Sequence, residues 1–217
     1  MRFAAVFISI LLAVGLRASE ATQKSIVVLG DSIAAGYGVE PEEAYPALLQ
    51  EKIDRAGLNY KVINGGVSGD TSAGGLRRID WLLRQKVDLL VLELGGNDGL
   101  RGISPDATSK NLQGIIDKVR EKYPDAKILI TGMEMPGSMG ADYTARFRAV
   151  FSSLAQKNKT AFLPFLLEGV GGKAELNQAD RIHPTLEGHK IVAENVWKVL
   201  KPMLDERKDS PTQTSSR

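Results

Sequence analysis

Residues 25–32 read SIVVLGDS, an apolar run that ends in Gly-Asp-Ser. Continuous rather than alternating apolar residues are typical of a strand in a parallel sheet, because helices cover both faces of such a sheet. Ser32 then stands at the carboxyl end of the strand, where ligands of such sheets bind. A serine hydroxyl in that place becomes a nucleophile when a histidine can take its proton. The stretch therefore predicts a buried strand and a candidate nucleophile directly after it.

Four further apolar runs follow, with stretches of helical spacing between them. This alternation predicts parallel strands joined by right-handed crossovers. Strands are expected at 25–30, 60–65, 87–94, 126–132 and 160–165, and helices at about 43–56, 74–85, 105–122, 141–157 and 185–203. The predicted fold class is α/β, a three-layer α/β/α sandwich around a flavodoxin-like five-stranded parallel sheet in the order 2-1-3-4-5. Because the winding direction switches at the first strand, the loops after the first three strands should converge.

Two glycine-rich loops follow the second and third strands, NGGVSGDTS at 64–72 and GGND at 95–98. Acyl transfer requires donors aimed at the oxygen that becomes negative in the tetrahedral intermediate, and losing one donor typically costs about 3 to 4 kcal/mol of transition-state stabilisation. We assign this oxyanion hole to the amide N–H of Ser32, the amide N–H of Gly69 and the side-chain amide of Asn97. Taken singly, Gly69 fits an ordinary turn equally well.

A candidate base and its carboxylate lie in an Asp-x-x-His motif after the fifth strand. The loop 166–183 is longer than most connections, and that length is needed to carry His183 back to the first strand. Pro184 favours an extended conformation at His183. Asp180 can then hold one ring nitrogen while the other faces the Ser32 hydroxyl. Ser32, Asp180 and His183 are thus predicted to form a catalytic triad.

Composition excludes several other classes of function. The chain has 217 residues, no Cys and a net charge of +2, so thiol nucleophiles, thiolate metal sites and disulfides are not available. Interspersed charges and few aromatic residues argue against nucleic-acid binding. The apolar stretch at 3–16 is shorter than a membrane span and predicts a cleaved signal peptide at 1–21. We expect a hydrolase domain at 22–205, a disordered polar tail at 206–217, and a monomeric, periplasmic or secreted protein with no stable membrane anchor.

The sequence blocks around these residues resemble those of the SGNH (GDSL-type) hydrolases, over nearly all of 25–204. GDSIAAGYG, VSGDTSAGGLRR, LELGGNDGLRG and LPFLLEGV are similar to blocks of its bacterial thioesterase I and arylesterase branch. The resemblance implies an esterase with thioesterase or lysophospholipase side activities, which acts on small acyl esters or thioesters without cofactor or metal. It also implies that Ser32, Asp180 and His183 are the triad, and that Gly69 and Asn97 complete the oxyanion hole.

Four residues are expected to contact the substrate: Asp31, Met135, Pro136 and Arg181. The segment MEMPGSMG at 133–140 follows the fourth strand near the proposed site and can wall an acyl pocket. Arg181 stands where the resembling family usually has a glycine, so it can change the loop geometry or place a cation near the acyl or leaving-group site. Ile33 replaces the usual leucine after the serine, a near-neutral change of shape.

Two further polar residues are expected to have structural rather than catalytic or metal-binding roles. Glu93, within the third strand, is expected to pair with Arg77 or Arg78, because a carboxylate among apolar residues needs compensation. His189 is expected to be an exposed or half-buried residue of the last helix, since the histidines lack the spacing of a helical zinc site.

Two alternative classes remain to be weighed. A flavodoxin-like binding module would hold a phosphate or nucleotide in the loop 30–38 without hydrolase activity, although the chain lacks the Gly-Lys-Ser/Thr and G-x-G-x-x-G patterns. An α/β-hydrolase is disfavoured because Ala34 occupies the last position of the Gly-x-Ser-x-Gly elbow.

Overall fold

The computed structural model describes residues 22–205, which contain a five-stranded parallel sheet. Its order, β2-β1-β3-β4-β5, confirms the predicted one. The strands are β1 (Lys24–Gly30), β2 (Tyr60–Gly66), β3 (Leu89–Glu93), β4 (Lys127–Thr131) and β5 (Ala161–Leu163). The signal peptide and the polar tail predicted at 1–21 and 206–217 lie outside the described residues, and the domain boundaries stay predictions.

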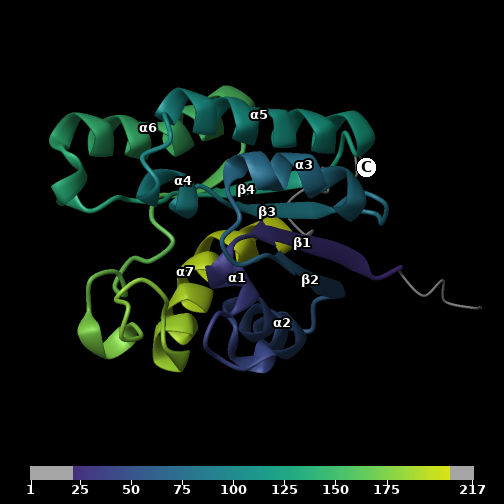
Figure 1. Ribbon diagram of the computed structural model, residues 1–217. Coiled ribbons are helices and arrows are strands. Elements are labelled where there is room, and N and C mark those ends of the chain that lie inside the picture. The colour runs from purple at the N-terminus through teal and green to yellow at the C-terminus, as the bar shows by residue number, and fades with distance from the viewer. Residues whose placement is uncertain (1–21, 206–217) are drawn as a thin grey trace, which may run out of the picture.

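Helices cover both faces of the sheet and give the expected three layers (Figure 1). One layer consists of α3 (Ser72–Leu82), α5 (Pro105–Lys122) and α6 (Ala141–Asn158), and the other of α1 (Ser32–Ala35), α2 (Tyr45–Arg55) and α7 (Leu186–Leu204). The short α4 (Gly96–Leu100) follows β3, and single 3₁₀ turns lie at η1 (Pro41–Glu43), η2 (Gly137–Met139) and η3 (Ala174–Leu176). No helix within residues 22–205 is long and apolar enough to cross a membrane.

Side-chain caps explain where several helices begin. The hydroxyl of Ser104 accepts from the N–H of Asp106 at the start of α5, and that of Thr185 accepts from the N–H of Gly188 at the start of α7. The Thr71 hydroxyl caps α3 in the same way, so this helix starts at Ser72, two residues before the predicted position. The short helices α1 and α4 were not predicted, because one helical turn leaves no periodicity in the sequence.

The central strands position the site. β1 lies between β2 and β3, and its last residue, Gly30, is paired with Gly66 and Glu93. A Cβ atom at Gly66 would lie 2.3 Å from the backbone nitrogen of Ala35, so the glycine lets α1 pack directly on β2. The loops after β1, β2 and β3 therefore meet at one end of the sheet, as predicted.

Candidate active site

The local structure at Ser32 is a single helical turn directly after β1. The carboxylate of Asp31 accepts a hydrogen bond from the N–H of Ile33 at 3.1 Å, and Gly36 ends the turn in the left-handed region, at φ 76°. Ser32 is 8% exposed. The turn thus holds the largely buried serine at the first helical position.

His183 and Asp180 approach Ser32 in a hydrogen-bonded row. His183 Nε2 lies 2.9 Å from Ser32 Oγ, and His183 Nδ1 lies 2.6 Å from Asp180 Oδ2. Asp180 Oδ1 also accepts from the N–H groups of Ile182 and His183, at 2.9 and 3.0 Å. The hydrogen bond from His183 and these backbone donors lower the pKa of Asp180 to about 2. An ionised Asp180 favours the tautomer with a proton on Nδ1, which leaves Nε2 free to accept from the serine.

The loop before α7 is folded back so that it delivers His183. The N–H of Gln178 donates to the carbonyl of His183 at 2.8 Å, and the Gln178 side chain donates to the carbonyl of Tyr37 at 2.6 Å. The rings of Tyr37 and His183 have centroids 4.5 Å apart. The Asp-x-x-His segment is therefore fixed both to its own loop and to the chain that follows Ser32.

The three predicted oxyanion donors lie on the converging loops. Asn97 Nδ2 donates to the carbonyl of Asp70 at 2.9 Å and to Asp31 Oδ2 at 3.2 Å. Within residues 22–205 neither the N–H of Ser32 nor that of Gly69 donates to another group. Gly69 has a φ of 78°, and Arg101 donates to its carbonyl at 3.0 Å. The positive φ thus favours glycine at this position. The hydrogen bond from Arg101 fixes the orientation of the Gly69 peptide.

Two ionic residues, Arg78 and Asp98, hold these loops together through contacts that the sequence did not predict. Arg78 bonds the carboxylate of Asp70 at 2.6 Å and donates to the carbonyls of Gly65 and Gly30, at 2.7 and 2.9 Å. Asp98, which is fully buried, accepts from Ser72 and Thr108. In the sequence, an acidic residue stands in each glycine-rich loop, Asp70 in one and Asp98 in the other. This pattern does not identify the residue that pairs with either carboxylate.

Two predictions about buried polar residues are wrong. Glu93 pairs with neither predicted arginine, because Arg78 is committed to Asp70 and Glu93 Oε2 accepts the N–H of Asp31 at 3.2 Å. His189 is fully buried, because it lies where α7 packs on α2. Its Nδ1 accepts a hydrogen bond there from the N–H of Tyr45 at 3.3 Å. Burial lowers the pKa of His189 to about 4, so the ring is neutral at physiological pH.

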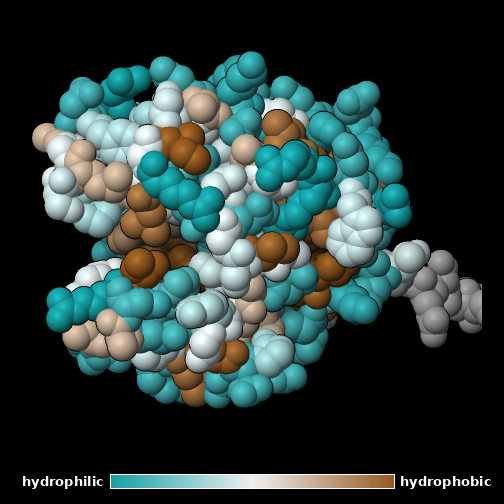
Figure 2. Space-filling view, viewed as in Figure 1, coloured by the Kyte–Doolittle hydropathy of each residue, from teal (hydrophilic) through white to brown (hydrophobic). Residues whose placement is uncertain are grey.

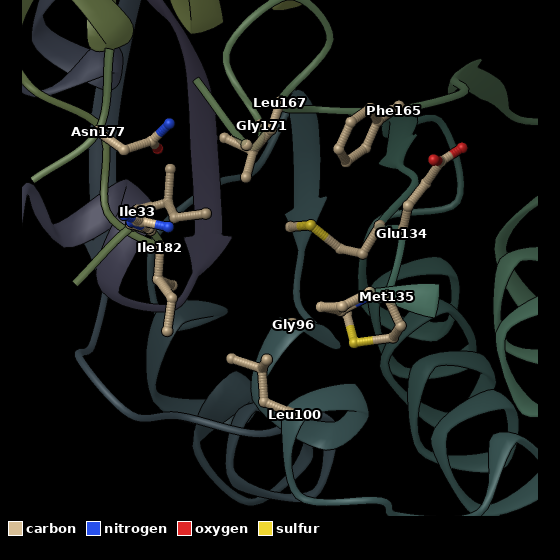
Figure 3. A pocket seen from close by; sticks show the side chains of 14 residues that line it. Ile33, Gly96, Leu100, Glu134, Met135, Phe165, Leu167, Gly171, Asn177 and Ile182 are labelled. Carbon is tan, nitrogen blue, oxygen red and sulfur yellow. The ribbon is translucent and has the colours of Figure 1, made fainter. Parts of the chain in front are cut away.

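A mainly apolar cavity of about 410 Å³ is lined by Ile33, the residue after Ser32, and by Ile182, the residue before His183. Figure 3 shows Ile33 and Ile182 on one wall, with Met135 and Phe165 opposite, and Figure 2 shows the hollow as a brown-lined recess at the left of the view. Met135, Pro136 and Arg181, three of the four residues predicted to contact the substrate, line the cavity. Asp31 does not, because its carboxyl group is buried behind the serine turn, 2% exposed.

Two charged residues line the cavity, and they differ in their surroundings. The carboxylate of Glu134 is paired with Arg148 at 2.9 Å. Arg181 makes no ion pair in the described part of the chain, and its φ of 60° is unusual for a residue with a side chain. The cavity therefore combines apolar walls with one unpaired cation.

The site carries no feature of a phosphate or metal centre. The loop 30–38 contains the buried Asp31, whose carboxylate would repel a phosphate. Among residues 22–205 no three acidic, histidine or cysteine side chains are grouped to hold a metal. The flavodoxin-like binding alternative is therefore not supported.

A serine, a histidine and a carboxylate in a hydrogen-bonded row, at the carboxyl end of a doubly covered parallel sheet, define a serine hydrolase. The chain belongs to the GDSL-like lipase/acylhydrolase family, whose model matches residues 28–191.

Known proteins of this kind are similar over most of the chain. Esterase TesA of Pseudomonas aeruginosa is 43% identical over 201 residues, covering 92% of this chain and 99% of the relative. The thioesterase 1/protease 1/lysophospholipase L1 of Escherichia coli is 37% identical over 186 residues, 85% and 87% of the two chains. A crystal structure of TesA has a TM-score of 0.80 and 44% identity, covering 83% of this chain and 100% of that one.

Proposed function

We propose that the protein hydrolyses carboxylic esters and acyl thioesters through an acyl-enzyme on Ser32. The observation that carries the proposal is the row from Asp180 through His183 to Ser32, with contacts of 2.6 and 2.9 Å, beside an apolar cavity. Ser32 Oγ attacks the carbonyl carbon while His183 Nε2 takes the hydroxyl proton, and Asp180 stabilises the resulting imidazolium.

The following steps return the enzyme to its starting state. The oxyanion accepts hydrogen bonds from the N–H groups of Ser32 and Gly69 and from the side-chain amide of Asn97. Because this NH₂ group has two hydrogens, Asn97 exchanges its hydrogen bond to the Asp70 carbonyl for the one to the oxyanion and keeps the one to Asp31. His183 gives its proton to the leaving alcohol or thiol as the carbon–oxygen or carbon–sulfur bond breaks. A water molecule, deprotonated by His183, then hydrolyses the acyl-enzyme and releases the acid and Ser32.

The walls of the cavity suit an acyl chain. Ile33, Leu100, Met135, Phe165 and Ile182 offer apolar contact, and Met135 can adapt to chains of different shape. We place aryl esters, acyl-CoA thioesters and lysophospholipids among the substrates; the names of relatives include arylesterase, thioesterase and lysophospholipase. The enzyme is proposed to act as a monomer in the periplasm or outside the cell, after removal of residues 1–21.

Covalent labelling tests the proposed nucleophile. A fluorophosphonate probe should react with the folded enzyme at a 1:1 ratio, and mass mapping should place the adduct on the peptide that contains Ser32. Prior saturation with an aryl ester should slow the labelling, because both compounds compete for the same hydroxyl. A folded enzyme that hydrolyses esters but stays unlabelled, or is labelled elsewhere, rejects Ser32 as nucleophile.

Arg181→Gly should stabilise the protein and weaken its use of anionic substrates. Relief of the left-handed conformation, partly offset by the flexibility of glycine in the unfolded chain, should raise the free energy of unfolding by about 0.5 to 1 kcal/mol. Loss of the unpaired cation should lower kcat/KM about tenfold for an ester with a carboxylate-ended acyl chain or for an acyl-CoA, relative to a neutral ester of equal length.

The matched control is Lys159→Gly, the other non-glycine residue with positive φ in the described part of the chain, at 50°. Lys159 ends α6, away from the cavity lining, so this variant should gain stability with unchanged kinetics. An equal fall in kcat/KM for neutral and anionic substrates in Arg181→Gly would show that Arg181 does not recognise the charge of the substrate.

A further inference from the structure

Within the described residues 22–205, Glu93 is the one fully buried acidic side chain of the sheet, and the catalytic steps do not use it. It ends the central strand β3 and is paired in register with Gly30, directly behind the serine turn. Its Oε2 accepts the N–H of Asp31 at 3.2 Å, whereas Oε1 has no partner. A Cβ atom at Gly30 would lie 2.1 Å from Oε2, so the glycine of Gly-Asp-Ser makes room for this carboxyl group.

The carboxyl group of Asp31 is the direct neighbour of Glu93. Glu93 Oε2 accepts from the N–H of Asp31 at 3.2 Å, and the Asp31 carboxyl group accepts from the N–H of Ile33 at 3.1 Å and from Asn97 Nδ2 at 3.2 Å. Asp31 thus connects the buried carboxyl group to the serine turn and to an oxyanion donor.

Among residues 22–205 no lysine or arginine forms an ion pair with these two carboxyl groups. The groups that face them are the buried Tyr45 hydroxyl from α2, which has no partner, and His183 from the loop before α7. Arg78 from α3 is bonded to Asp70 and to carbonyl oxygens. Burial, and then the charge of Asp31, raises the pKa of Glu93 well above the usual range. Two carboxyl groups in contact in such a place share one proton.

We propose that Glu93 is a positioning residue that stays protonated in the working enzyme and donates a hydrogen bond to Asp31, which in turn holds Asn97 and the serine turn in place for oxyanion stabilisation. This inference rests on the proposed function. When Glu93 loses its proton, the two carboxylates repel each other and Asp31 no longer holds Asn97. Turnover therefore falls on the alkaline side, through kcat rather than KM.

Glu93→Gln is the informative variant, because its amide reproduces both contacts of the protonated acid. The carbonyl oxygen accepts from the N–H of Asp31, and the NH₂ group donates to the Asp31 carboxylate without ionising. It should keep kcat within about threefold at neutral pH and lose the alkaline fall. Glu93→Leu, which makes neither contact, should lower kcat about ten- to a hundredfold with KM unchanged, at most the cost of one oxyanion donor.

The proton itself can be observed without any turnover. The infrared spectrum of the wild type at neutral pH should show the carbonyl stretch of a protonated carboxyl group, which Glu93→Gln lacks. The control is Thr131→Val, a fully buried polar residue of the adjacent strand β4, which should keep the band and the alkaline fall. Absence of the band, or an alkaline fall that persists in Glu93→Gln, overturns the proposal. Because the band needs no substrate, that failure is distinguishable from failure of Ser32 labelling.

Discussion

Replacing Ser32 or His183 by alanine is expected to lower kcat for ester hydrolysis about a millionfold, and the double variant should be no slower than either single one. The two side chains act as one unit, since the hydroxyl is a weak nucleophile until His183 Nε2, 2.9 Å away, accepts its proton. Residual hydrolysis of about a thousandfold over water should remain, because Gly69 and Asn97 still stabilise the oxyanion.

The measurement is kcat with an aryl ester at saturating substrate, on proteins whose thermal unfolding is compared with that of the wild type. Ser152→Ala, on the exposed face of α6, is the matched control and should be fully active. Retention of more than about a hundredth of wild-type activity in Ser32→Ala, or a double variant as slow as the product of both effects, would contradict the assignment.

The parts of the fold that the sequence predicts are those that follow from local patterns. The continuous apolar runs, such as 25–30, identify buried parallel strands, and helical connections require crossovers. Once β1 lies between β2 and β3, the loops that carry Ser32, Gly69 and Asn97 must meet. Their convergence was therefore predictable from topology alone, without knowledge of any side-chain contact.

Long-range side-chain contacts were not predictable in this way. A carboxylate in an apolar strand suggests an arginine partner, yet Glu93 lies against Asp31 because the register of β1 and β3 places Gly30 beside it. Likewise, the spacing of α7 does not reveal that His189 faces the start of α2. Both contacts depend on how two elements far apart in the sequence are packed, which a residue's own neighbours do not encode.

Asp180→Asn should lower kcat about ten-thousandfold while the protein stays folded. The asparagine oxygen can still accept from the N–H groups of Ile182 and His183, which the carboxylate now receives at 2.9 and 3.0 Å. Its NH₂ group then faces His183 Nδ1 as a donor and favours the tautomer with the proton on Nε2. That nitrogen can no longer take the proton of Ser32, so the serine stays unactivated.

Acid unfolding gives a second measurement on the same variant. The pKa of Asp180 is lowered to about 2 in the folded protein, below its unfolded value of 3.8. The ionised carboxylate therefore stabilises the fold above about pH 4, and this contribution is lost as the pH falls toward 2. Asp180→Asn should lack that part of the pH dependence, whereas Asp142→Asn, on the exposed first turn of α6, should keep it. An Asp180→Asn enzyme with near wild-type kcat would show that the loop and Tyr37 are sufficient to orient His183. The side chain of residue 180 would then only accept the backbone hydrogen bonds of its own turn.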